Sequence, residues 1–395
     1  MAQKQQVTTA TGNIAAGIGA SLCRLDVIAA YPITPQSPVV EYLADLVYNG
    51  KIDARMIQVE SEHAAMAVCQ GAASVPGRVF TATSAQGLAL MYEPYFSQAT
   101  LRLPMVMTIA SREMTAPETI WSGQQDTMSV RNSGWMHVYV ENNQEILDMV
   151  IQGYRIGEDK DILLPVLVSY DGFYLSHFTE RLEVPQQEDV DRFLPRYEPD
   201  HVIFDPEHSL CLSPITPGNL FIEYRRSHFA ALDRAFEKID QVDDEYAKIF
   251  GRRWGGLIEE YRCDDAEIVI LTIGSMTGTA KVAVDAARER GIKVGLIKVR
   301  FMRPFPGKRI AKVLANKKAW ASLDRSVEFG WGCGPIYMET KAAYGVPVSS
   351  FSAIGGLGGA DINLSDVTKV IEALDATKDT EGQKETLWLT KPITI

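Results

Sequence analysis

The sequence lacks the cysteine patterns that hold metals and clusters. No two of its five cysteines form a C-x-x-C pair; they stand at Cys23, Cys69, Cys211, Cys263 and Cys333. This excludes a zinc ribbon, a thioredoxin-type site and a ferredoxin-type cluster bound by this chain. Because a free cysteine usually behaves as a small buried hydrophobic residue, we expect all five to be structural.

Long apolar runs and basic blocks are also missing. No stretch of 18 uncharged apolar residues occurs, so we expect no membrane span. The first residues carry only Lys4 before a Thr- and Gly-rich stretch, unlike a signal peptide, and we expect a cytoplasmic location. With 39 basic and 50 acidic residues the net charge is −11, and we expect neither nucleic acid nor a membrane as a partner.

The length and composition fit two or three globular domains. The chain has 395 residues, of which 46% are hydrophobic, enough for more than one core. In residues 1–195, apolar runs alternate with helical patterns. We predict strands at 26–31, 56–59, 79–83, 104–110, 138–140 and 163–170, with helices at 37–49, 63–74, 87–98 and 142–157. This alternation predicts an α/β fold, a doubly wound parallel sheet covered on both faces.

The pattern changes twice further along the chain. Residues 196–263 form a connector, a clamp against another surface, interrupted by Pro199, Pro206, Pro214 and Pro217 and containing a long helix at 224–254. A second α/β domain occupies 264–395, with strands at 268–273, 293–299, 319–323 and 348–351 and helices at 278–290, 306–316 and 335–344. The polar tail after Lys378 is expected to be loosely held.

Polar residues follow four strands of the first domain at the point where each strand ends. These segments are Tyr31–Pro35, Glu60–His63, Ser84–Gly87 and Ser111–Glu113. Ligands of open parallel sheets bind beyond the carboxyl ends of the strands. One sheet edge therefore gathers a hydroxyl, two carboxylates, an amide and a guanidinium, and this edge is the predicted site.

Each candidate side chain also has an ordinary structural interpretation. Glu62 in the first turn of a helix is favoured by the helix dipole, or it is a buried carboxyl group with a raised pKa. Arg112 is a surface cation, or it captures a carboxylate or phosphate in a bidentate manner. Thr34 lies between two prolines and is a turn hydroxyl or a ligand. His63 and His177 are expected to be structural, and no G-x-S-x-G elbow is present.

Three glycine-rich stretches allow close backbone approach. Residues 274–278 join a strand to a helix and could hold an anion, although the Walker lysine and the full G-x-G-x-x-G are absent. Residues 330–334 and 355–359 look like close-packing or interface loops.

The strand-end motifs together resemble a known family. Tyr31-Pro32-Ile33-Thr34-Pro35, Glu60-Ser61-Glu62, Thr83–Gly87 and Ala110-Ser111-Arg112 are similar to the first domain of 2-oxoacid:ferredoxin oxidoreductases. The resemblance continues through Gly123–Asp126, Tyr170–Phe173 with Ser176-His177, and Gly358–Ile362. It implies a pyrimidine-type thiamine diphosphate-binding domain followed by a transketolase C-terminal-like domain.

The resemblance also implies roles for individual residues. Glu62 would hydrogen-bond the aminopyrimidine ring of thiamine diphosphate and favour the imino form that removes the thiazolium proton. Pro32 would line the cofactor, with Glu62 and Arg112 also touching it. Thr34 and Arg112 would hold the 2-oxoacid, so that Glu62, Thr34 and Arg112 are the expected catalytic residues. We expect no metal ligand in this chain.

Missing motifs indicate a subunit that works with partners. No Gly-Asp-Gly occurs, the motif by which thiamine enzymes usually hold the diphosphate and Mg2+. The resemblance implies a β-type chain for the diphosphate, Mg2+ and a [4Fe-4S] cluster, with γ-type and ferredoxin-like δ-type chains beside it. Ferredoxin would accept the electrons and coenzyme A the acyl group. The chain alone would be nearly inactive.

The expected substrate is pyruvate, oxidised reversibly to acetyl-CoA and CO2. Thr34 resembles the pyruvate type, whereas an arginine there would suit oxalate. Met114 and Trp121 could instead admit a longer side chain, as in branched-chain 2-oxoacids or 2-oxoglutarate. A non-catalytic assembly module that kept the fold is the second hypothesis. The missing G-x-G-x-x-G makes a free-standing dehydrogenase the weakest hypothesis.

Overall fold

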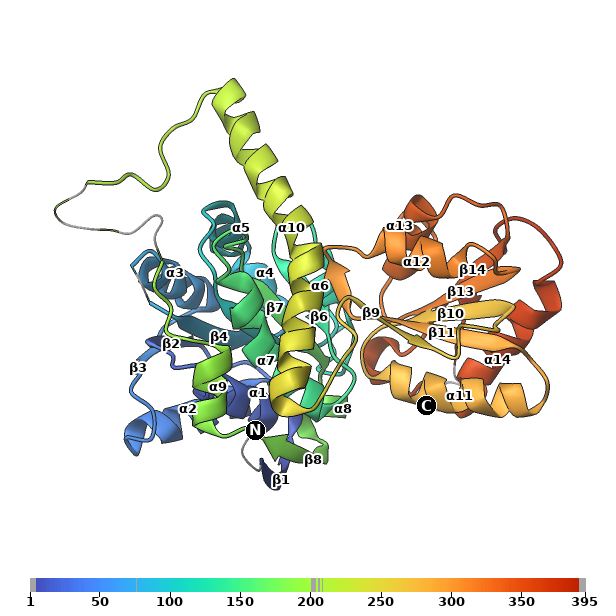
Figure 1. Cartoon of the computed structure of the whole chain (residues 1–395), viewed down its shortest axis with the longest axis horizontal. Coiled ribbons are helices and arrows are strands. Elements are labelled where there is room, and N and C mark those ends of the chain that lie inside the picture. Colours follow the sequence, from blue (N-terminus) through green and yellow to red (C-terminus); the bar gives the residue numbers. More distant parts are fainter. Residues whose placement is uncertain (1–4, 76, 200–203, 205–206, 208, 391–395) are drawn as a thin grey trace.

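A seven-stranded sheet organises the first half of the molecule (Figure 1). The computed structural model describes residues 5–75, 77–199, 204, 207 and 209–390. The strand order is β12-β6-β7-β5-β4-β2-β3. These strands are β2 (Val27–Ala30), β3 (Arg55–Gln58), β4 (Val79–Thr83), β5 (Val106–Ser111), β6 (Met136–Tyr139), β7 (Val166–Asp171) and β12 (Phe301–Arg303). All neighbours are parallel except β12 and β6, so the predicted parallel α/β sheet is confirmed.

Helices cover both faces of this sheet because alternate strand residues point to opposite sides. In β5, Val106 and Ala110 join one core, whereas Met107 and Ile109 join the other. The first core includes α1 (Gly12–Ser21), α2 (Ser37–Tyr48) and α7 (Asn143–Gly157), and the second includes α3 (Glu62–Ala73), α4 (Ala85–Leu90) and α5 (Tyr92–Thr100). Both faces of the sheet are therefore buried, which explains why the strand sequences are continuous apolar runs.

Local side chains set where the helices begin. The Ser61 hydroxyl accepts a hydrogen bond from the Ala64 amide at 3.2 Å and starts α3, and Asn142 does the same for α7 at the Glu145 amide. The single helix predicted at 87–98 is wrong, because the chain bends at Met91 between α4 and α5. Within residues 1–195, six elements escaped prediction: α1, α6 (Gln125–Ser129), α8 (Tyr174–His177), α9 (Gln187–Phe193), and the antiparallel pair β1 (Gln6–Thr11) and β8 (Thr179–Val184).

The connector contains one helix of 33 residues, α10 (Gly218–Phe250). It begins and ends earlier than the predicted helix at 224–254, and Gly251 ends it with a φ of +76°. Its C-terminal half packs on the first core, where Ala235, Ile239 and Tyr246 are buried. Its first turns project beyond the rest of the molecule (Figure 1). Pro206, named above as an interruption, lies outside the described residues.

A six-stranded sheet forms the second unit, in the order β15-β14-β13-β10-β11-β9. Its strands are β9 (Ile258–Tyr261), β10 (Ile268–Thr272), β11 (Val294–Val299), β13 (Ala319–Asp324), β14 (Ser349–Ile354) and β15 (Leu387–Trp388). Its helices are α11 (Met276–Glu289), α12 (Gly307–Leu314), α13 (Pro335–Ala343) and α14 (Leu364–Thr377). The expectation of a loose tail is wrong for residues 387–389, because β15 pairs with β14 and Leu389 packs on this core.

The two units share structure across their junction. Strand β12 follows β11 in sequence yet pairs with β6 of the first sheet. The segment boundaries 1–195, 196–263 and 264–395 stay a prediction. In the described part of the chain, no helix is both long and apolar enough to cross a membrane.

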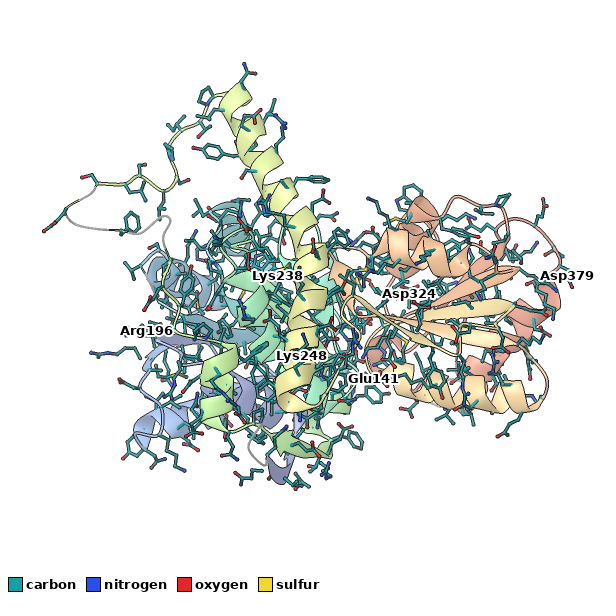
Figure 2. All side chains as sticks on the ribbon, in the orientation of Figure 1. Glu141, Arg196, Lys238, Lys248, Asp324 and Asp379 are labelled. Atoms are coloured by element: carbon teal, nitrogen blue, oxygen red, sulfur yellow. The ribbon has the colours of Figure 1, made fainter. Side chains whose placement is uncertain are left out.

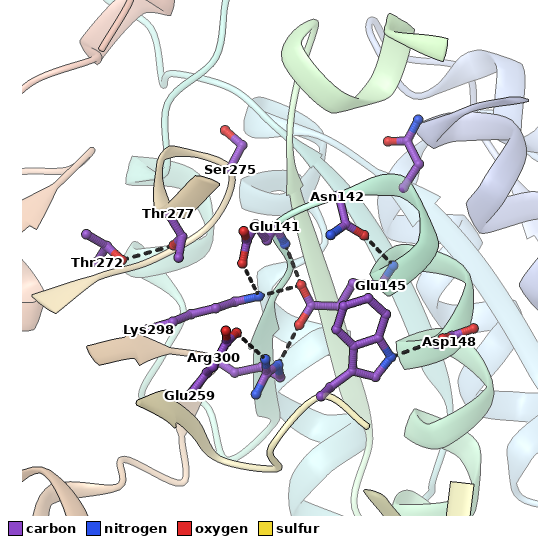
Figure 3. Close-up of polar contacts among 12 residues, drawn as sticks. Glu141, Asn142, Glu145, Asp148, Glu259, Thr272, Ser275, Thr277, Lys298 and Arg300 are labelled. Atoms are coloured by element: carbon purple, nitrogen blue, oxygen red, sulfur yellow. Dashed lines mark hydrogen bonds and ion pairs between the residues drawn. The ribbon is translucent and has the colours of Figure 1, made fainter. Parts of the chain in front are cut away.

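A buried carboxylate joins the two units (Figure 3). Glu145 in α7 lies 2.5 Å from Nζ of Lys298 and 2.5 Å from Nε of Arg300, and all three side chains are fully buried. Burial alone raises the pKa of Glu145, but the two cations outweigh it and hold that pKa at about 2. The carboxylate therefore stays ionised at neutral pH.

Three further residues balance the charge of this cluster. Glu141, at the junction in Figure 2, lies 3.0 Å from Lys281 and 3.1 Å from Lys298. Glu259 lies 2.8 Å from Lys281 and 3.4 Å from Arg300. Glu141 and Glu145 of the first unit and Glu259 of the second unit thus balance three cations of the second unit. Only Glu145 and its two cation partners are fully buried, so removal of Glu145 leaves two buried cations without their shared anion.

We expect Glu145→Gln to destabilise the full chain by about 3–5 kcal/mol, because two buried cations lose their shared anion. Urea unfolding of the purified chain measures this loss. Glu223→Gln is the matched control: its exposed pair with Arg226 contributes below about 1 kcal/mol. Equal stabilities of the two variants would contradict the structural importance of the cluster.

Candidate active site

Arg112 is held at the carboxyl end of β5 by the loop after β2 and by the first turn of α4. Its Nη1 donates to the carbonyl oxygen of Thr34 at 2.8 Å, and its Nη2 donates to Oε1 of Gln86 at 2.7 Å. Thr34 follows β2 and Gln86 follows β4, so the ends of three strands meet at one guanidinium. The structure thus brings together two of the predicted site residues, Thr34 and Arg112.

Glu62 lies beside the first turn of α4, the turn that also carries Gln86. Its side chain is only 6% exposed, and a Cβ added to Gly87 would come within 2.6 Å of its Oε1. Any larger residue at position 87 would therefore collide with this carboxyl group. Burial raises the pKa of Glu62, and a hydrogen bond from its own backbone amide only partly opposes this. The structure agrees with both interpretations of Glu62, because the residue lies in the first turn of α3 and its carboxyl group is also buried.

Thr34 and Pro32 form the open rim of the site. Both residues are exposed, and Thr34 reaches Arg112 through its backbone carbonyl rather than its hydroxyl. A ligand or another chain can therefore reach both side chains from outside.

Two buried donor groups of the site have no hydrogen-bond partner among the described residues. Arg112 is 7% exposed, and its Nε has no hydrogen-bond partner there. The buried hydroxyl of Thr83, which borders Gly87, also has none. A guanidinium has five N–H donors, of which Thr34 and Gln86 take two, so three remain. The site therefore presents a cation with free donors beside a carboxyl group of raised pKa, which fits a ligand with acceptor atoms and a proton to share.

Asp126 fixes the backbone on which these residues lie. Its buried carboxylate accepts hydrogen bonds from the amides of Ala85 (3.0 Å), Arg112 (3.1 Å) and Thr127 (2.7 Å) and from the Ser111 hydroxyl. Burial raises the pKa of Asp126 to about 6. Sequence reasoning gave no role to Asp126 and none to Gln86 beyond a strand-end amide; the only signal was their place in the quoted motifs.

The second unit closes against this edge of the first sheet. Asp171, the last residue of β7, accepts from the Ser275 amide at 2.9 Å and from Nε2 of Gln124 at 3.1 Å, and it lies 3.4 Å from Arg325. The helix start at 274–278 was predicted as a possible anion site. The anion found there is the carboxylate of Asp171 of the same chain.

The glycine loop at 355–359 is an interface loop, as predicted. Gly359 donates its amide to the Ser122 carbonyl at 2.8 Å, and Gly358 donates to Oε1 of Glu113 at 3.3 Å. Burial raises the pKa of Glu113 to about 7, and the nearby Asp126 adds to this effect. Residues 330–334 were expected to form the same kind of close-packing or interface loop. In this chain they leave the side chain of Trp331 exposed.

The histidines and cysteines contribute little to the site. His63 is exposed, and His177 is exposed and stacks on Phe173 with ring centroids 4.9 Å apart. Four cysteines are buried as expected, but Cys211 is exposed, so the expectation fails for that one. Within the residues that the structure covers, no group of three or more His, Cys, Asp or Glu could hold a metal ion.

The class of this protein follows from comparison with protein families, which identifies an oxidoreductase chain with a thiamine diphosphate-binding domain. Residues 18–244 match the family described as pyruvate flavodoxin/ferredoxin oxidoreductase, thiamine diphosphate-binding, and residues 266–367 match pyruvate:ferredoxin oxidoreductase core domain II. The first match alone covers more than half of the chain. The chain belongs to the 2-oxoacid:ferredoxin oxidoreductase family, as the motifs predicted, and aligns with its separate alpha subunits.

Individual relatives extend over nearly the full length. The chain is 43% identical to the alpha subunit of NADH-dependent phenylglyoxylate dehydrogenase from Aromatoleum evansii, covering 98% of this chain and 95% of that protein. It is 42% identical to pyruvate synthase subunit PorA of Methanocaldococcus jannaschii, covering 97% and 98%. A solved 2-oxoglutarate:ferredoxin oxidoreductase from Magnetococcus marinus shares the fold, with a TM-score of 0.74 and 20% identity over 93% of this chain and 65% of that one.

We predict that Glu113 makes the stability of the chain depend on pH. Its pKa is about 7 when folded and about 4.5 when unfolded, so between these values only the folded state holds the proton. Stability from this group is therefore present at low pH and lost as pH rises through 7. Relative to Glu113→Gln, the wild-type chain should lose about 1–3 kcal/mol of unfolding free energy between pH 5 and pH 8.

Urea unfolding at several pH values measures this difference. Glu118→Gln, which changes an exposed carboxylate on the same loop, is the control and should leave the wild-type pH dependence unchanged. A Glu113→Gln variant whose stability follows pH as the wild type does would disprove the assignment.

Proposed function

We propose that this chain is the alpha subunit of a pyruvate:ferredoxin oxidoreductase, which oxidises pyruvate with coenzyme A to acetyl-CoA and CO2 and passes the electrons to ferredoxin. The observation that carries the proposal is a single sheet edge where Glu62, Arg112 and Thr34 come together. The buried carboxyl group of Glu62 adjoins the start of α4, whose Gln86 contacts Arg112, and Arg112 in turn donates to the carbonyl of Thr34. Family membership and the pyruvate synthase relative support the same reaction.

Thiamine diphosphate fits the donor set of this edge. Glu62, with its raised pKa, would share a proton with the aminopyrimidine ring, and Gly87 leaves room beside its carboxyl group. Pro32 at the exposed rim would line the cofactor, and Arg112 would lie near it. When bound, thiamine diphosphate supplies the nucleophilic carbon and the electron sink that decarboxylation of a 2-oxoacid needs.

Arg112 and Thr34 would bind the 2-oxoacid. The guanidinium keeps three free N–H donors, including the buried Nε, for the substrate carboxylate. The exposed hydroxyl of Thr34 would donate to the keto oxygen or the carboxylate. Burial strengthens the interaction with Arg112 because little water competes there.

Partner chains would complete the enzyme. The chain has no Gly-Asp-Gly and no cluster-binding cysteines, so a β-type subunit would hold the diphosphate, Mg2+ and a [4Fe-4S] cluster. Subunits of γ and δ type and ferredoxin would carry the electrons onward in the cytoplasm. The open rim at Pro32 and Thr34 is where the β-type subunit would cover the cofactor.

Pyruvate is the proposed substrate, and the relatives define the competitors. One relative acts on phenylglyoxylate and another is a ketoisovalerate oxidoreductase subunit, at 43% and 40% identity. Assays of the purified complex with pyruvate, 2-oxoisovalerate, 2-oxoglutarate and phenylglyoxylate, each with coenzyme A and a low-potential acceptor, test the choice. A higher kcat/KM for any acid other than pyruvate would reassign the substrate within the family.

Glu62→Gln should lower turnover of the assembled complex at least about a hundredfold, because the amide cannot exchange a proton with the cofactor. The measurement is pyruvate-dependent acceptor reduction at saturating cofactor. Glu41→Gln, on the exposed face of α2, is the control and should keep wild-type turnover. Wild-type turnover in Glu62→Gln would refute the proposed role.

The double change Thr34→Ala with Arg112→Ala separates an enzyme from a non-catalytic assembly module. We expect kcat/KM for pyruvate to fall by a factor of about 100 or more, since a charged and a neutral hydrogen bond to the substrate are both lost. Native gel analysis checks that the complex still assembles. Near-normal kinetics in an assembled complex would favour the assembly module.

A further inference from the structure

The side-chain amide of Gln86 contacts both Arg112 and the loop that follows β5. Its Oε1 accepts from Nη2 of Arg112 at 2.7 Å, and its Nε2 donates to the hydroxyl of Thr115. Gln86 is half-buried and lies directly before Gly87, which borders Glu62. The amide thus connects α4 to two residues of the segment that follows β5, and the next residue of α4 borders Glu62.

Hydrogen-bond chemistry fixes which way this amide points. A guanidinium can only donate, so the carbonyl end of Gln86 must face Arg112. The NH2 end then faces Thr115, whose hydroxyl can accept. In the reverse orientation, the NH2 group of Gln86 would face the N–H groups of Arg112, and neither side could accept a hydrogen bond. The contact to Thr115 therefore helps to keep the acceptor directed at the guanidinium.

Both groups that hold the guanidinium of Arg112 are uncharged. They are the Thr34 carbonyl and the Gln86 amide, so they fix the direction of the guanidinium without neutralising it. A carboxylate in place of the amide would form an ion pair with Arg112 and compete with any anionic ligand. A neutral acceptor leaves the full positive charge, and the free Nε, for that ligand.

We propose that Gln86 is a positioning residue, which directs the guanidinium of Arg112 toward the substrate carboxylate while leaving its charge free. The inference rests on the proposed function, because it takes Arg112 as the group that binds the 2-oxoacid. It adds that a neutral amide, rather than an acid, is required at position 86, and that Thr115 assists by fixing the orientation of this amide.

Gln86→Glu in the assembled complex tests the charge requirement. The new carboxylate has the size of the amide but pairs with Arg112, so KM for pyruvate should rise roughly 10- to 100-fold, with a smaller change in kcat. Gln70→Glu, a half-buried glutamine on α3 that bonds the Ser97 hydroxyl, is the matched control.

Two further variants test positioning without adding charge. Gln86→Leu removes the acceptor, and Thr115→Val removes the hydroxyl that orients the amide. Both should weaken binding of oxamate, a carboxylate that resembles pyruvate but is not decarboxylated, as measured by calorimetry. We expect a loss of roughly tenfold for Gln86→Leu and a smaller loss for Thr115→Val.

The outcomes separate this inference from the proposed function. If the wild-type complex does not turn over any 2-oxoacid, the proposed function fails. If the wild type is active but Gln86→Glu and Gln86→Leu keep wild-type KM and oxamate affinity, the positioning role is wrong. A fall in kcat at unchanged affinity would also overturn it. If a Gln86 variant does not assemble, Thr115→Val decides, and unchanged oxamate affinity in that variant counts against the inference.

Discussion

The candidate site depends on the buried carboxylate of Asp126. This one group accepts hydrogen bonds from the Ala85 amide at the end of β4 and from the Arg112 amide and the Ser111 hydroxyl at the end of β5. A buried acceptor without partners would be costly, so these donors are held firmly. Gln86 follows Ala85 directly, so Asp126 fixes the backbone on both sides of the contact between Gln86 and Arg112.

A second buried carboxylate, Glu145, sets how the two α/β units meet. Its bonds to Lys298 and Arg300 hold the second sheet against α7 (Figure 3). With the units fixed in this way, Asp171 occupies the start of α11 and the glycine loop at 355–359 reaches Glu113. Charged groups are costly to bury, and here each one has partners of opposite sign. The second unit thereby supports the edge of the first sheet on which the site lies.

The sequence predicted the parallel sheets and the strand-end residues because these follow from local patterns. Continuous apolar runs marked β4, β5 and β7, and the capping residues Ser61 and Asn142 precede α3 and α7. Elements that depend on distant partners escaped prediction. Strand β12 has only three residues and forms because β6 offers an edge, and β1 forms because β8 pairs with it.

The sequence predicted which residues belong to the site, but it did not predict which of them contact one another. Glu62, Thr34 and Arg112 were named from their positions after strands, and the structure brings Thr34 and Arg112 into contact and places Glu62 beside the first turn of α4. The contacts of Asp126 span 41 and 14 residues, and that of Gln86 with Arg112 spans 26. No periodicity in the sequence encodes such pairs. Likewise, only the folded chain shows that Thr34 contacts Arg112 through its carbonyl.

The most direct test is a structure of the assembled complex with thiamine diphosphate bound. The account predicts that a ring nitrogen of the aminopyrimidine lies within hydrogen-bond distance of the Glu62 carboxyl group, about 2.6–3.0 Å. It also predicts that Arg112 and Thr34 border the reactive carbon of the cofactor. A cofactor bound far from these three residues, or a Glu62 side chain turned to solvent in the complex, would contradict it.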